Sequence, residues 1–168
     1  MSKTTAVKVS PSMKFSRSIL GEHDTQEVAG ALQQILVDLI DLGNQVKQAH
    51  WAVVGPSFTP VHAFLDTIAA STAEAVDATA ERMTALNATP DGRISTVAER
   101  TELQSFPIGP LKSGEVVTLI ADRLAAVIGR IRGHEARMRD TDAVSSDLLV
   151  GFLHTFEKQL WMLQAQEA

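Results

Sequence analysis

The sequence contains no cysteine, which excludes disulfide bonds, zinc–thiolate sites and catalysis by a thiol. It has no uninterrupted apolar run near the ~18 residues that a membrane span requires. Its first 21 residues are rich in serine, threonine and lysine and lack the apolar centre of a signal peptide. These absences predict a cytoplasmic protein without a membrane-spanning segment. With 168 residues, of which 45% are hydrophobic, the chain can bury one substantial core.

Acidic residues are also absent from the first 21 positions. The basic residues of this segment are Lys3, Lys8, Lys14 and Arg17. The whole chain has a formal net charge of −5, so the rest of it is strongly acidic. This separation predicts a flexible basic arm over residues 1–22 and a folded domain over residues 23–168. A basic arm on an acidic body is suited to electrostatic contact with DNA, although four charges equally fit a solubilising tail.

Apolar residues recur with a helical period in four long stretches. These stretches run from Asp24 to Trp51, from Thr59 to the turn at Thr89–Gly92, from Ser113 to the break at Asp140–Asp142, and from Ala143 to Gln164. No strand pattern or repeat competes with this assignment. Residues 93–112 form a connection that is long for a compact bundle, with a short helix expected around Thr96–Thr101. Four helices with one long crossover predict an all-α, ferritin-like four-helix bundle.

Five metal-ligand side chains are grouped around the end of the first helix and along the second. They are His50, His62, Asp66, Asp77 and Glu81. The last four form two pairs of residues four apart, and each pair shares one helix face. The two pairs cannot bind one ion within a single chain, because the 11 residues from Asp66 to Asp77 span roughly 16 Å of helix.

Two-fold symmetry would bring these pairs together. The positions 62 and 81, and likewise 66 and 77, are centred between Ser71 and Thr72. If two copies of this helix crossed antiparallel at that point, the first pair of one chain would face the second pair of its partner. Small residues between the pairs would allow a close approach: Ala69, Ala70, Ala73 and Ala80. The alternative is an ordinary solvated face of an amphipathic helix.

Other kinds of active site have less support. No Glu-x-x-His motif occurs, which disfavours a di-iron site in the centre of each bundle. His154 and Glu157 are three apart on the last helix and are expected to form a surface contact. The chain has no Gly-x-Ser-x-Gly motif, but a metal-dependent hydrolase using the same five ligands remains an alternative.

The spacing of these residues resembles the Dps family (DNA-binding protein from starved cells), whose members are miniferritins. The resemblance covers roughly residues 25–166 and keeps all five ligand positions. It rests on Lys47-Gln-Ala-His50-Trp51, Val54-Gly-Pro-Ser-Phe58, Val61-His62-Ala-Phe-Leu-Asp66, Asp77-Ala-Thr-Ala-Glu81-Arg82 and Thr89-Pro-Asp-Gly92. The resemblance implies a hollow homo-oligomer of twelve subunits with ferroxidase sites at the two-fold interface.

The resemblance further implies that Fe(II) is oxidised by hydrogen peroxide or dioxygen and stored as ferric mineral, with zinc as a competitor for the ligands. Trp51 would lie beside the site and supply an electron, with packing as its alternative role. Trp161 is expected in the core. Asp147 matches an acidic pore position through which iron enters, and Asp140 and Asp142 are nearby candidates whose alternative role is helix capping.

DNA binding is the part of the resemblance that this sequence supports least. The arm with Lys3, Lys8, Lys14 and Arg17 has fewer lysines than strong DNA binders of the family, and the C-terminus ends without a basic tail. A DNA-compacting shell protein at the nucleoid is therefore an alternative function rather than a consequence of the family.

Overall fold

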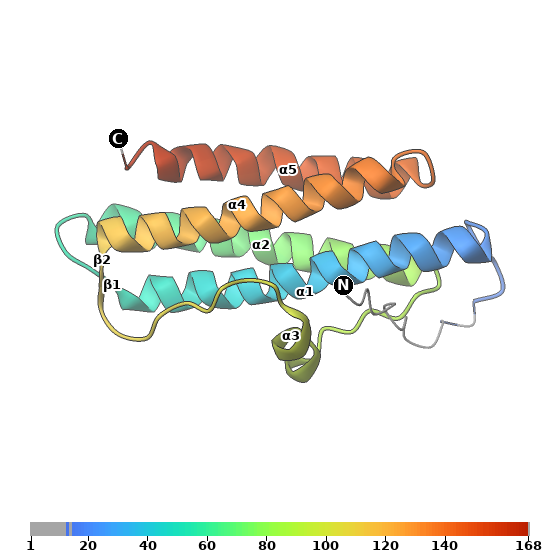
Figure 1. Ribbon diagram of the computed structural model, residues 1–168, viewed down its shortest axis with the longest axis horizontal. Coiled ribbons are helices and arrows are strands. Elements are labelled where there is room, and N and C mark those ends of the chain that lie inside the picture. Colours follow the sequence, from blue (N-terminus) through green and yellow to red (C-terminus); the bar gives the residue numbers. More distant parts are fainter. Residues whose placement is uncertain (1–12, 14, 168) are drawn as a thin grey trace, which may run out of the picture.

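Two helical hairpins lie side by side in the computed structural model, which describes residue 13 and residues 15–167. The first hairpin joins α1 (Glu22–Ala52) to α2 (Phe58–Ala85), and the second joins α4 (Ser113–Met138) to α5 (Ala143–Gln164) (Figure 1). The connection between the hairpins carries the short helix α3 (Ile94–Arg100) and passes along the outside of α1. The predicted all-α four-helix bundle with a long crossover is confirmed.

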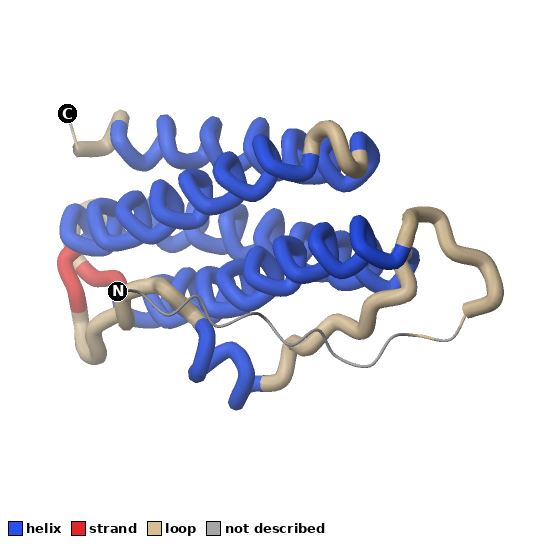
Figure 2. The backbone as a smooth tube through the Cα atoms, turned by 45° about the vertical axis from the view of Figure 1, so that its right-hand side comes forward, coloured by secondary structure: helices blue, strands red, loops and turns tan. Residues whose placement is uncertain are grey.

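Two strands that the sequence did not predict join the hairpins at one end. β1 (Val53–Val54) pairs in parallel with β2 (Leu111–Lys112), and Figure 2 shows them together in red. A strand of two residues is too short to produce a periodic pattern. The pair holds the end of α1 beside the start of α4, so α2 and α4 begin at the same end and run parallel. This explains the long crossover.

Helix starts differ from the predicted ones by up to four residues. Gly21, rather than Asp24 or Thr25, is the N-cap of α1, and Asp24 lies in the first turn, where a carboxylate favours the helix dipole. α2 begins before the predicted cap, so Pro60 lies inside its first turn. Proline is tolerated there because first-turn N–H groups have no partner within the helix.

α1 is the central helix of the core. It packs against α2, α4 and the crossover, and its apolar side chains Leu32, Ile35, Leu36, Leu39 and Leu42 are at most 1% exposed. Its buried polar residues are paired. The Gln33 amide exchanges two hydrogen bonds with the backbone of Asp91, at 2.8 and 2.9 Å, which attaches the crossover to α1.

Trp161 was expected in the core, and this prediction is wrong, because its side chain is 64% exposed. α5 packs mainly on α4 and leaves one face open. Phe156 and Leu163 are each 1% exposed and define the buried face of α5. Trp161 follows Phe156 by five residues, a rotation of about 140° at ~100° per residue, and therefore points away.

The turn between α4 and α5 contains buried ion pairs. Asp142 is 5% exposed and accepts hydrogen bonds from Arg82 at 2.7 Å and from the Ser145 hydroxyl at 2.5 Å. Next to it, Glu135 accepts from Arg139 and Ser146, which lowers the pKa of Glu135 to about 2. Asp142 therefore uses its carboxylate for contacts within the chain, and its role at an iron-entry pore stays a prediction.

The described part of the predicted arm contacts the folded domain. The Met13 N–H donates to the Asn87 carbonyl at 2.9 Å, and the Asn87 amide donates to the Arg17 carbonyl at 3.3 Å. Leu20 packs against the core. The other basic residues of the arm, Lys3, Lys8 and Lys14, lie outside the described residues, so the arm stays a prediction. Within the described part of the chain, no helix is long and apolar enough to cross a membrane.

Candidate metal centre

Three of the five predicted ligands meet where α1 ends and α2 begins. One ligand atom from each of His50, His62 and Asp66 can be chosen so that all lie within 4.8 Å of one another. Two atoms bound to one transition-metal ion lie at most about 4.2 Å apart, at ~2.1 Å per bond. The three side chains therefore need to move only slightly to bind a common ion. Burial decreases from His50, which is buried, through His62 to exposed Asp66.

Each histidine is held by the backbone of the other. Nδ1 of His50 lies 3.2 Å from the His62 carbonyl, and Nδ1 of His62 lies 3.0 Å from the His50 carbonyl. The His50 carbonyl is available because it belongs to the last turn of α1. An Nδ1–H that donates to a carbonyl leaves Nε2 as the free lone pair, which is the arrangement of a metal-binding histidine. The two rings stack with centroids 3.5 Å apart.

Asp66 forms an ion pair with Lys47, a residue that was not among the predicted site residues. Lys47 Nζ donates to Asp66 Oδ1 at 2.8 Å, and His50 Nδ1 lies 3.2 Å from the same oxygen. The hydrogen bond from Lys47 is the main reason that the pKa of Asp66 is lowered, and the two histidines lower it further. Both contacts use Oδ1, so Oδ2 is the oxygen that can bind an ion. Spacing offered a signal, since Lys47 precedes His50 and Trp51 by three and four residues.

Two aromatic side chains flank the centre. Phe58 packs on the His62 ring with centroids 4.8 Å apart, a contact that no spacing in the sequence indicated. Trp51 is 71% exposed, and Lys47 Nζ lies 6.0 Å from its ring centroid. The high exposure disagrees with a packing role for Trp51 within one chain. It leaves the indole at the surface next to the ligands.

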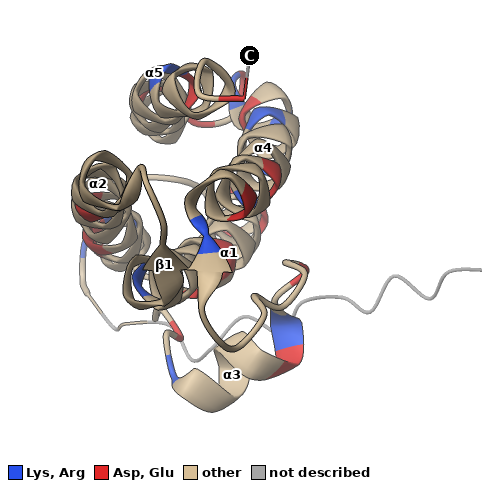
Figure 3. Cartoon of the chain, turned by 90° about the vertical axis from the view of Figure 1, so that its left-hand side faces the viewer, with Lys and Arg blue, Asp and Glu red and all other residues tan. Residues whose placement is uncertain are grey.

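Asp77 and Glu81 do not join this cluster within the chain. Both are exposed on α2, and they lie roughly 16 Å (Asp77) and 22 Å (Glu81) further along the helix than Asp66. Figure 3 shows acidic residues in red along the outer side of α2. Asp140 and Asp147, the other two predicted pore residues, are likewise exposed at the turn before α5 and in its first turns. The cluster within one chain therefore contains three of the five predicted ligands.

The chain is similar to known proteins over most of its length. A model of the ferritin-like domain matches residues 29–167. The DNA protection during starvation protein of Agrobacterium fabrum is 31% identical over 139 residues, covering 82% of this chain and 86% of that protein. Mycobacterium smegmatis Dps aligns with a TM-score of 0.86 and 27% identity, covering 90% of this chain and 92% of that chain. Dps from Microbacterium arborescens in the high iron form aligns with a TM-score of 0.85 and 26% identity, covering 89% and 98%. The chain belongs to the Dps family of ferritin-like proteins.

Proposed function

We propose that this protein oxidises Fe(II) at centres shared between two chains and stores the product as ferric mineral inside a shell of identical subunits. The observation that carries the proposal is the cluster of His50, His62 and Asp66, in which both rings are oriented by backbone carbonyls. The similarity to a Dps solved in a high iron form supports iron as the substrate.

The ligand set suits the reaction. Two imidazole nitrogens and a carboxylate oxygen bind Fe(II) well, and the absence of thiolate disfavours Cu(I). Three ligands leave coordination positions for the partner's carboxylates and for an oxidant. With hydrogen peroxide, two Fe(II) ions each lose one electron, the O–O bond breaks, and two protons complete two water molecules. Zinc binds the same ligand types and is expected to inhibit by competition.

The missing ligands would come from a second chain. In the proposed two-fold arrangement, Asp77 and Glu81 of one chain face Asp66 and His62 of its partner. A shallow groove of about 430 Å³ between α1 and α2 supports packing of a helix at this position. Its lining is small and mostly apolar, and includes Gly43 of α1 with Ala69 and Ala73 of α2. Twelve subunits are expected from the family, since the spacing itself requires only a dimer.

Iron oxidation by purified protein tests this function. Iron-free protein should form an assembly larger than a dimer by light scattering, and should oxidise Fe(II) rapidly when hydrogen peroxide is added. His62→Ala should slow the reaction at least ~10-fold, because a metal ligand is lost. His154→Ala, which removes an exposed histidine from α5, is the matched control and should retain the wild-type rate. A stable monomer with full activity, or equal rates in both variants, would contradict the proposal. The peroxide-dependent reaction also separates this function from the alternative of a metal-dependent hydrolase, which needs no peroxide.

The same shell is proposed to take up iron through acidic openings that contain Asp147, with Asp140 nearby. Both side chains are exposed, and negative charge around a narrow opening raises the local cation concentration.

DNA binding is a second proposed activity, favoured by the basic arm and by the name of the Agrobacterium relative, which describes a role in DNA protection. Deleting residues 2–17 should abolish a DNA mobility shift at low salt, since a shell multiplies weak phosphate contacts by avidity. Iron oxidation should be unchanged. Replacing Lys3, Lys8, Lys14 and Arg17 by glutamine keeps the arm length and should have the same effect on DNA. If the intact protein gives no shift at low ionic strength, the arm has no such role.

A further inference from the structure

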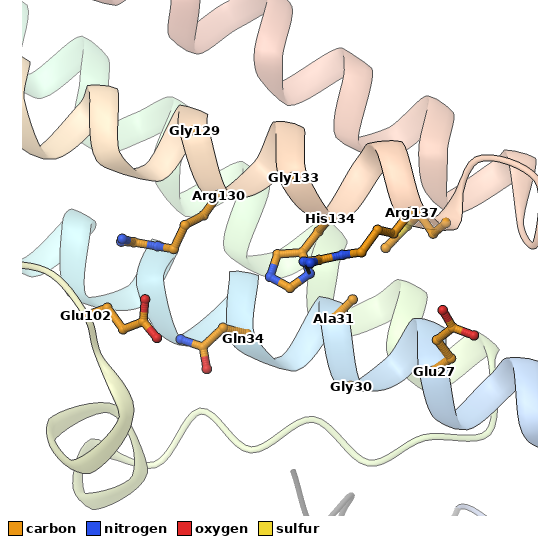
Figure 4. A pocket seen from close by; sticks show the side chains of 11 residues that line it. Glu27, Gly30, Ala31, Gln34, Glu102, Gly129, Arg130, Gly133, His134 and Arg137 are labelled. Atoms are coloured by element: carbon orange, nitrogen blue, oxygen red, sulfur yellow. Dashed lines mark hydrogen bonds between the residues drawn. The ribbon is translucent and has the colours of Figure 1, made fainter. Parts of the chain in front are cut away.

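A charged cleft lies between the N-terminal half of α1 and the C-terminal half of α4, far from the metal centre. Its volume is about 680 Å³. Figure 4 shows the side chains that line it. The α1 residues that line it precede His50 by at least 16 positions, or roughly 24 Å of helix. The proposed iron chemistry uses none of its side chains.

Glycines keep the cleft open on both sides. Gly30 of α1 and Gly129 and Gly133 of α4 line it, and a Cβ added at any of them would meet no atom within 4 Å. Glycine within a helix is otherwise unfavourable relative to alanine. The helices do not approach closely enough to require glycine at these positions. The lack of side chains there instead leaves space between the two helices.

Basic side chains of α4 project into that space. Arg130, His134 and Arg137 are spaced by four and three residues, which places them on one helix face. Arg130 donates Nε to Asp38 at 2.7 Å, while its Nη2 is buried without a hydrogen-bond partner. Arg137 reaches back along the cleft, and its Nη2 donates to His134 Nδ1 at 3.1 Å (Figure 4).

The contact between Arg137 and His134 is compatible only with a neutral imidazole, because a protonated Nδ1 cannot accept a hydrogen bond. Burial, then Arg137 and Arg130, lower the pKa of His134, and Glu102 of the crossover acts in the opposite direction. From α1, Glu27 lines the cleft and Asp38 lies behind Arg130. An anion between the ring and the guanidinium would offset the repulsion that Arg137 and Arg130 exert on a protonated His134.

We propose that the cleft binds a small tetrahedral oxyanion, such as inorganic phosphate, between the Arg137 guanidinium and the His134 imidazole. The planar guanidinium can donate two parallel hydrogen bonds to such an anion, and the imidazolium donates another. Glu102 and Glu27 flank opposite ends of the cleft (Figure 4), so an extended polyanion such as a DNA strand would be repelled where a small anion is not. The proposal is independent of iron oxidation.

Equilibrium dialysis of the iron-free protein against radiolabelled phosphate tests the site. Binding should saturate at one phosphate per chain. Arg137→Gln should weaken it about 10-fold or more, the value of a charged hydrogen bond. Gly133→Leu should abolish it by filling the cleft without changing the charge. Arg132→Gln is the matched control, because Arg132 lies on the same helix but pairs with Glu157 of α5. Circular dichroism and gel filtration establish that each variant is folded.

A pH series with sulfate, whose charge is constant, tests the role of the imidazole. Affinity should rise as the pH falls from 8 to 5.5, because His134 becomes protonated, and His134→Gln should remove that rise. The comparison of the wild type with His134→Gln also distinguishes protonation of His134 from protonation of Asp38, whose pKa is raised by burial. Phosphate binding that survives both Arg137→Gln and Gly133→Leu, or that falls equally in Arg132→Gln, would overturn the proposal. So would a short DNA duplex that binds the cleft while free phosphate does not.

Discussion

Two inactive variants of this protein are expected to restore each other's iron oxidation when they are assembled together. The first carries His62→Ala and Asp66→Ala, and the second carries Asp77→Ala and Glu81→Ala. Each alone should lose at least ~100-fold of the fast reaction, because every shared centre lacks two ligands. In a mixed dimer, one centre receives both damaged halves, while the other receives only intact side chains.

Random mixing makes about half of the dimers mixed, and each of these has one intact centre of two, so roughly a quarter of the wild-type rate should return. The variants are unfolded together and refolded, and native mass spectrometry verifies mixed assemblies. Variants that are refolded separately and then combined are the control and should stay inactive. A centre formed within one chain predicts no recovery at all, since every chain carries a lesion. Mixed shells without activity would therefore refute the shared centre.

The largest expected loss of stability follows from Arg82→Ala. Arg82 forms an ion pair with Asp142, and their side chains are only 13% and 5% exposed. Removing the guanidinium leaves a buried carboxylate without its cation, which costs about 3–5 kcal/mol of unfolding free energy. For a domain of this size the thermal midpoint should fall by roughly 10 °C. Calorimetry at one fixed protein concentration measures the effect, because oligomer stability depends on concentration.

Arg132→Ala is the control for this experiment. Its ion pair with Glu157 has side chains that are 61% and 38% exposed, so it should contribute less than about 1 kcal/mol. The double change Arg82→Ala with Asp142→Ala removes the charge that the single change leaves unpaired, and it should recover part of the loss. Equal thermal midpoints for the Arg82 and Arg132 variants would show that the buried ion pair stabilises the fold no more than the exposed one.

The bundle could be predicted from sequence because its helices are long and periodic. Apolar spacing along α1 and α4 identified the buried faces, and Ala143–Gln164 matches the observed α5. Two kinds of feature had no local signal. The β1–β2 pair joins residues nearly 60 positions apart through two residues each, and the exposure of Trp161 depends on which neighbours α5 has in space.

The candidate centre shows the same division. Spacing of four placed His62 and Asp66 on one face of α2, since helix geometry alone decides that. The contact of His50 with His62 depends on how α1 and α2 pack and where each helix ends, which no periodicity encodes. The position of Lys47 on Asp66 depends on the same packing. Whether Asp77 and Glu81 complete the centre depends on a second chain, and it stays a prediction.

The location of the ligand cluster within one hairpin bears on when activity begins. His50, His62 and Asp66 lie between positions 50 and 66, so they come together as soon as α1 packs on α2, and such local contacts form early in folding. The remaining ligands, in the proposed arrangement, arrive only with another subunit. A newly synthesised chain would then carry its ligand cluster but no oxidising centre. It would gain that centre when it associates with a second subunit, which is also the first step in assembling the shell. Ferric product would therefore form only in assemblies that can enclose it.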